Sequence, residues 1–530
     1  MAGPSTAQPD SAVSAPPMEP ALPHTTPRAQ SLVLPTFEDT FERPPRVWPA
    51  RQGLMGRAVN AISSMFQSPY EITRELPPQS ESGASVPHLH ALHEQAMPRS
   101  YHLLGDTRFG HMRGYRQSKR IVVLGVHGWY AQSLLKNVIG APIGTSIRFA
   151  SMMADSIRRQ FADVDVELDD EAITTIAIQH DGRVQDRADH AFHAIQANAE
   201  WVDALHHADA VFVAAHSQGA PVATLLLSKL LQEGILHVKR TRMCLLTMCG
   251  IFQGPFAHLK GTIATQYINY FETSAARELF DFQNSDSEVS QKLQSAYRYI
   301  LSAGAKVVHV GSMDDNVVPL FSALYSSAAH PSILRAVFVD GVAFPKKDFL
   351  IMLIVLCVAI RNAGFHDHNL LTLLSSSVAG SLYSGLGHTV LYDEPAVYDL
   401  AARYLFETYS PRTSGASEIP LVTMPYAPQR WNSYELPWSM RGLLEDNVIQ
   451  HFFSKDIRLV LQDFAAWRPI GKQLKELQWR LSPLRTVKLP AEMERPESQT
   501  TWSGDDEKDY DETTMPSIAK THHGKPVSKL

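Results

Sequence analysis

The sequence predicts an α/β fold with a doubly wound, mainly parallel sheet, and two patterns lead to this class. Short, nearly continuous runs of Val, Ile, Leu and Ala recur between residues 121 and 341, as expected for strands that are buried on both faces. Amphipathic stretches of helical length separate these runs, as they do in β-α-β units. We therefore expect one large domain whose sheet is covered by helices on both sides.

The expected elements follow in chain order. Strands are expected at residues 121–126, 174–179, 210–215, 242–249, 305–311 and 335–341, and helices at 148–161, 191–208, after Gly219, at 348–361 and at 394–406. The apolar helix at 348–361 permits two interpretations. It is either a plain core helix, which we favour, or a lid that roofs a site and accepts an acyl chain.

The flanking segments differ from this domain in composition. Residues 1–50 contain eleven prolines and are expected to form a disordered arm. Residues 51–117 form an N-terminal extension, in which 54–66 has one apolar helical face that docks on the main domain or, alternatively, contacts a membrane surface. The domain itself spans 118–410, with an insertion at about 342–387. Residues 411–489 are expected to form a helical extension, and 490–530 a disordered acidic tail.

Composition limits the function classes. The chain has 530 residues, 44% of them hydrophobic, and a net charge of -6, which is typical of a soluble globular protein and gives no basic field for nucleic acid. The three cysteines lie in apolar runs, which indicates free core thiols of a protein in a reducing compartment. The longest apolar run, 349–360, is shorter than the roughly 20 residues of a membrane-spanning helix. The last three residues, Ser528, Lys529 and Leu530, match the signal that the peroxisomal import receptor binds, so we expect a peroxisomal protein, with a cytoplasmic one as the alternative.

The most informative segment is Ala210 to Leu231, in which an apolar run turns sharply into a helical stretch. The turn reads Ala215-His216-Ser217-Gln218-Gly219. A tight strand-to-helix turn that exposes one hydroxyl requires small residues two positions before and after the serine. Ala215 and Gly219 occupy these positions, although glycine is usual at the first. The pattern predicts that Ser217 is a nucleophile.

A serine nucleophile needs a base and an acid that orients the base, in the chain order Ser, acid, His. The expected strand at 305–311 is followed by Asp314 and Asp315. We favour Asp315 as the acid because of its position relative to the turn Val317-Val318-Pro319, and Asp314 is the alternative. His388 is the expected base, since it lies between glycine-rich residues and the helix at 394–406. Its nearest rivals, His366 and His368, are interpreted as part of a solvated loop, because no matching ligand cluster suggests a metal there.

When the serine attacks, negative charge develops on the carbonyl oxygen of the substrate, and backbone N–H groups that point at this oxyanion are needed to stabilise it. Gln218, directly after the serine, offers one at the start of its helix. The loop after the first strong strand contains His127, Gly128 and Trp129, and Gly128 or Trp129 is expected to supply the second. We expect no cofactor and no metal.

These pieces resemble the α/β-hydrolase superfamily, in the order HGW (127–129), AHSQG (215–219), DDNVVP (314–319) and GHT (387–389). In the segments GAPIGTS (140–146), VVPLFSA (317–323) and GSLY (380–383), the chain is similar to a fungal group of lipase-like serine hydrolases. The resemblance covers residues 118–410. It implies the α/β-hydrolase fold and a Ser-His-Asp triad, and it says little about the substrate.

The sequence therefore favours a serine hydrolase that acts on acyl esters or thioesters, with a lipid or other acyl compound as substrate. Acyl transfer by the same triad is a close alternative. A scaffold or lipid-binding protein that uses a hydrolase fold without catalysis is the competing class, because a fold does not imply a function.

Overall fold

The computed structural model describes thirteen parts of the chain, and every structural statement below concerns them. They are residues 30–42, 46, 97–100, 120–128, 144–163, 168–238, 240–259, 274–344, 349–377, 386–409, 419, 421–426 and 432–486. The expected helix at 54–66, Trp129, the acidic tail and the C-terminal tripeptide lie outside these residues. Within them, no helix has the length and apolar character needed to cross a membrane.

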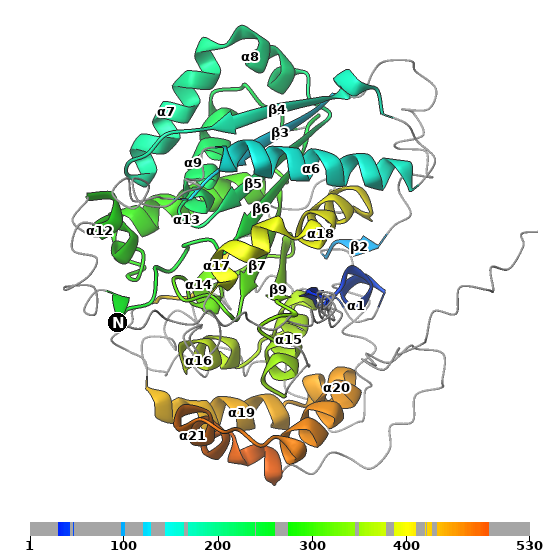
Figure 1. Cartoon of the computed structure of the whole chain (residues 1–530), viewed down its shortest axis with the longest axis vertical. Coiled ribbons are helices and arrows are strands. Elements are labelled where there is room, and N and C mark those ends of the chain that lie inside the picture. Colours follow the sequence, from blue (N-terminus) through cyan, green and yellow to red (C-terminus); the bar gives the residue numbers. More distant parts are fainter. Residues whose placement is uncertain are drawn as a thin grey trace, which may run out of the picture.

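A seven-stranded, mainly parallel sheet forms the centre of the molecule (Figure 1), as the sequence predicts. Its strands are β1 (Leu32–Leu34), β3 (Ile121–Val126), β4 (Ile173–Ile178), β5 (Ala210–His216), β6 (Arg242–Met248), β7 (Lys306–Ser312) and β9 (Ile333–Val339). Their spatial order is β1-β9-β7-β6-β5-β3-β4. From β3 the chain first adds β4 on one side and then adds β5, β6, β7 and β9 in turn on the other, so the sheet is doubly wound and the strand order reverses between β3 and β5.

Each central strand contributes side chains to two different cores. In β5, Val211, Val213 and Ala215 join one hydrophobic cluster, and the alternate residues Phe212 and Ala214 join a second. Both faces are apolar because successive side chains of a strand point to opposite faces, and helices cover both. The continuous apolar runs of the sequence follow directly from this arrangement.

Helices cover the two faces (Figure 1). One face carries α6 (Thr145–Ala162) and α18 (Pro395–Phe406). The other carries α7 (Val184–Ala197), α8 (Ala199–His206), α9 (Gly219–Gln232) and α13 (Glu288–Ser302). The single helix expected at 191–208 is therefore wrong, because the helical region begins at Val184 and breaks at Asn198. The Asn198 side chain caps α8 by accepting the backbone N–H groups of Glu200 and Trp201.

A third cluster joins the predicted insertion to the C-terminal helices. It contains α15 (Phe349–Asn362), α16 (Leu370–Ser377), α19 (Leu436–Glu445), α20 (Asn447–Ala466) and α21 (Lys472–Arg480). The latter three form a layer beside α15 and α16 in Figure 1. Nearly all side chains of α15 are buried against β9 and α20, so α15 is a core helix and not a lid.

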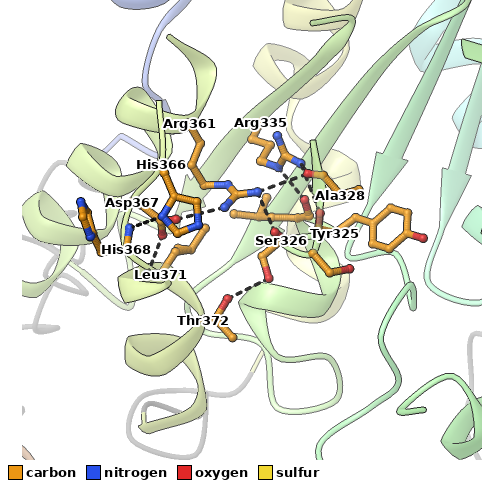
Figure 2. Close-up of polar contacts among 12 residues, drawn as sticks. Tyr325, Ser326, Ala328, Arg335, Arg361, His366, Asp367, His368, Leu371 and Thr372 are labelled. Atoms are coloured by element: carbon orange, nitrogen blue, oxygen red, sulfur yellow. Dashed lines mark hydrogen bonds and ion pairs between the residues drawn. The ribbon is translucent and has the colours of Figure 1, made fainter. Parts of the chain in front are cut away.

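Buried arginines fasten the insertion to the sheet (Figure 2). Arg335 on β9 donates to the carbonyl oxygens of Leu324 and Ala328, and Arg361 on α15 donates to that of Ser326. Arg361 also pairs with Asp367 at 3.0 Å. The expectation of a solvated loop at 365–368 is wrong, because Asp367 is fully buried in this ion pair and His368 bonds Asp446 on the C-terminal helices.

Part of the proline-rich arm is ordered, which corrects the expectation for residues 1–50. Residues 32–34 form β1, which pairs antiparallel with β9 at the sheet edge. The next residues form α1 (Phe37–Phe41), capped by Thr36 and packed against α18. Phe37 and Phe41 bury their rings in the second cluster, and this burial offsets the entropy lost on ordering.

Candidate active site

Ser217 lies on a sharp turn between β5 and α9. Its φ is 55°, in the left-handed region that residues other than glycine rarely adopt. Its backbone N–H donates to Met248 O (2.9 Å), and its carbonyl oxygen accepts from Ala220 and Ile251. A Cβ atom at Gly219 would lie 2.5 Å from the carbonyl oxygen of His127, so only glycine fits there. The expected elbow is thus present as a strained turn held by its neighbours.

Asp315 follows β7 and accepts three hydrogen bonds. Its Oδ1 accepts the backbone N–H groups of Val317 (2.7 Å) and Val318 (2.9 Å), and its Oδ2 accepts His388 Nδ1 at 2.8 Å. Burial by itself would raise the pKa of Asp315, but His388 and the two N–H groups outweigh it and hold the pKa below its usual value. The carboxylate is therefore ionised and directed at the imidazole.

Asp314, the alternative acid, makes different contacts. Its carboxylate accepts the backbone N–H of Leu386 at 3.2 Å, and its carbonyl oxygen accepts that of Gly387 at 3.0 Å. These bonds attach the short helix α17 (Gly387–Val390), which carries His388, to the end of β7. Asp315 therefore contacts the His388 ring, whereas Asp314 binds the backbone of the two residues that precede His388.

His216, the residue before the serine, also holds His388. Its Nε2 donates to the His388 carbonyl oxygen at 2.7 Å, and the two ring centroids lie 4.7 Å apart. Burial, and then the neighbouring His388, lower the pKa of His216 to about 3, so His216 is neutral and serves as a donor. Among the described residues, His388 bonds Asp315, whereas no hydrogen bond joins it to Ser217. Such bonds are often long until substrate is bound.

The expected oxyanion residues lie beside the serine. A Cβ atom at Gly128 would lie 2.9 Å from the Ser217 Cβ, so the loop after β3 passes directly over the elbow. Gln218 is fully buried and is the N-cap residue of α9, where a backbone N–H has no partner within the helix. Trp129, the other expected donor, lies outside the described residues.

With this geometry in place, comparisons identify the family. The model of the YMC0/YMC35 alpha/beta hydrolase domain matches residues 95–447, about two thirds of the chain. The chain belongs to this family. The hydrolase domain thus includes the elbow, both aspartates and His388, together with the insertion and part of the C-terminal helices.

A search of solved structures adds a distant similarity. The chain is similar to a lipase-esterase related protein from Clostridium acetobutylicum, with 13% sequence identity and a TM-score of 0.22, over 41% of this chain and 85% of that one. No curated protein matches the chain. The match to the family model therefore carries the assignment.

Cys249 lies beside Asp315 and His388 and was not predicted from the sequence. Its thiol, the Asp315 carboxylate and a His388 ring nitrogen lie within 4.8 Å of one another, a spacing that would suit a metal ion such as zinc. Two of these groups, Asp315 Oδ2 and His388 Nδ1, are bonded to each other at 2.8 Å, and burial and the nearby Asp315 raise the pKa of the Cys249 thiol well above its usual value. We therefore interpret Cys249 as a protonated neighbour of the triad. The contacts of His216 with His388, and of Arg187 with Gln218 and His127, were likewise not predicted.

A cavity of about 460 Å³ lies beside the segment that carries Asp315. Pro319 and Phe321 form one wall, and helices α16, α19 and α21 contribute others. Phe256 lines this cavity and also a small void that reaches Asp315. The volume falls within the range of small-molecule sites, about 300–1,000 Å³. The apolar side chains that line the cavity include Leu373, Leu436 and Leu477. The polar ones include Gln283, Asn432, Glu476 and Arg480.

Proposed function

We propose that this protein is a serine hydrolase that cleaves acyl esters or thioesters. The observation that carries the proposal is the 2.8 Å bond between Asp315 and His388, next to a serine held at a φ of 55° on a strand-to-helix turn. An ionised, buried carboxylate fixes the imidazole so that its other nitrogen is available to accept a proton.

In the proposed reaction, Ser217 attacks the acyl carbonyl carbon while His388 takes the hydroxyl proton. Asp315 stabilises the imidazolium that forms, and backbone N–H groups, that of Gln218 among them, bind the oxyanion. Collapse of the tetrahedral intermediate breaks the bond to the alcohol or thiol, which leaves with the proton from His388. Water, deprotonated by His388, then attacks the acyl-enzyme, releases the carboxylic acid and restores Ser217.

We further propose that the 460 Å³ cavity holds the acyl chain. Apolar side chains such as Phe321, Leu373 and Leu436 supply a surface for hydrocarbon, and the cavity borders the segment that follows Asp315. Burial of hydrocarbon there favours binding by roughly 0.8 kcal/mol for each methylene. The substrate class is then an ester or thioester with an apolar acyl group.

Hydrolysis of p-nitrophenyl esters and acyl-CoA thioesters of increasing chain length tests the reaction. The wild-type protein should hydrolyse at least one series, and Ser217→Ala should lose this activity. A folded wild-type protein that hydrolyses neither series contradicts the proposal, as does undiminished activity in Ser217→Ala.

A narrowed cavity tests the acyl site. Ser376 lies on α16 at the cavity wall, and Ser376→Trp should shift the preference towards shorter chains. Ser302→Trp, at the exposed end of α13 and away from the cavity, is the matched control. An unchanged chain-length profile in Ser376→Trp would show that the acyl group binds elsewhere.

A further inference from the structure

Arg187 is a fully buried cation that bridges the elbow and the loop after β3. It extends from α7, and its side chain is excluded from solvent. One guanidinium nitrogen, Nη1, donates to Gln218 Oε1 at 2.7 Å, and the other, Nη2, donates to the carbonyl oxygen of His127 at 2.9 Å. A single planar group therefore contacts both segments that are expected to bind the oxyanion.

Both segments are also fixed by other contacts. Gln218 Nε2 donates to the carbonyl oxygen of Gly182 at 3.0 Å, which immobilises the amide from its other end. The backbone N–H of His127 donates to Ser146 Oγ (3.1 Å), whose hydroxyl donates to Ile178 O (2.6 Å) at the end of β4. Arg187 thus completes a network that fixes the distance between the loop and the elbow.

The charge of Arg187 acts on the peptide between His127 and Gly128. In a trans peptide the carbonyl and the N–H point in opposite directions, so a cation at the carbonyl oxygen of His127 polarises the bond and makes the Gly128 N–H a stronger donor. The field reaches the loop: burial first, and then Arg187, lower the pKa of His127 to about 4. In a buried site such a fixed charge interacts strongly with an anion that forms nearby.

We propose that Arg187 is a positioning residue for the oxyanion hole, which holds the loop at 127–128 against the elbow and polarises its peptide. This inference rests on the proposed function, because it requires Ser217 to form a tetrahedral oxyanion. The interaction grows as negative charge develops, so Arg187 stabilises the transition state more than the bound substrate.

Three variants separate this role from a merely structural one. Arg187→Met removes the charge and both bonds, while Arg187→Lys keeps a charge that is unable to span both partners. Arg183→Met removes an exposed arginine just before α7 and serves as the control. For each variant we would measure thermal unfolding, kcat and KM for the best ester, and the Ki of a trifluoromethyl ketone that carries the same acyl chain and adds to the serine as an oxyanion.

Arg187→Met should lower kcat by about 100-fold and change KM less than about threefold. It should raise the Ki of the ketone by the same factor by which it lowers kcat/KM. The kcat of Arg187→Lys should lie between those of Arg187→Met and the wild type, and the kcat of Arg183→Met should match that of the wild type. A folded Arg187→Met protein with a kcat near wild type, or with a change in KM alone, overturns the inference. If Arg187→Met does not fold, Arg187→Lys provides the test, because full activity of the lysine variant also overturns the inference. A wild-type protein inert to esters and ketone contradicts the proposed function itself, and this inference with it.

Discussion

Replacing Asp315 by asparagine tests how the carboxylate controls the His388 ring. Oδ1 of Asp315 accepts two backbone N–H groups at 2.7 and 2.9 Å, so the single oxygen of an asparagine must remain there. The new NH₂ group then faces His388 Nδ1, which has to accept a hydrogen bond instead of donating one. The ring proton moves to Nε2, and His388 is unable to take the proton of Ser217.

The same substitution in a Ser-His-Asp triad costs about 10⁴-fold in kcat, or roughly 5–6 kcal/mol of transition-state stabilisation. We therefore expect Asp315→Asn to lower kcat by about that factor in an ester assay, with a normal unfolding temperature. Asp314→Asn is the matched control: it keeps an oxygen for the Leu386 N–H and should lose less than about tenfold. If kcat falls less than tenfold in Asp315→Asn, or more than tenfold in Asp314→Asn, the Asp315 carboxylate does not set the protonation of the His388 ring.

Three further predictions concern folding, pH and location. Gly219→Ala should lower the free energy of unfolding in urea by more than about 2 kcal/mol, because its Cβ would lie 2.5 Å from two backbone carbonyl oxygens. Gly471→Ala, at the N-cap of α21 where an added Cβ meets open space, should cost less than about 1 kcal/mol, and equal stabilities of the two variants would contradict this. Burial lowers the pKa of His216 to about 3 and that of His309 well below its usual value, so below about pH 6.5 the unfolded chain binds protons that the folded one does not. Each buried histidine should then reduce stability by about 1.4 kcal/mol per pH unit as the pH falls, and equal urea midpoints at pH 7.5 and pH 5 would disprove it. A fluorescent fusion that ends in residues 528–530 should enter peroxisomes and should stay outside without them; import of the truncated form would contradict the targeting signal.

Buried, local patterns were predictable from the sequence. The strand expected at 121–126 has the same bounds in the structure, and the one expected at 210–215 ends one residue later, because strands buried on both faces are continuous apolar runs. The expected order of Ser217, Asp315 and His388 followed from the strand-to-helix turn at the serine, after which the acid and then the histidine are expected. In the structure Ser217 follows β5, Asp315 follows β7, and His388 lies in α17, ahead of α18.

Features that depend on distant partners were not predictable. Residues 32–34 are a short apolar run among prolines, and they form a strand by pairing with the edge of β9, a partner that is distant in the sequence. Asn198 caps a helix inside an amphipathic pattern that continues through it. Arg187 has the sequence context of an ordinary polar helical residue, since its two partners lie 31 and 60 positions away.

Covalent labelling with a fluorophosphonate tests whether Ser217 is a nucleophile. The wild-type protein should gain the mass of one fluorophosphonate adduct, and peptide mapping should locate the adduct on Ser217. Ser217→Ala, with the same unfolding temperature, should gain none. An unlabelled wild-type protein, or an adduct that persists in Ser217→Ala, would contradict the account.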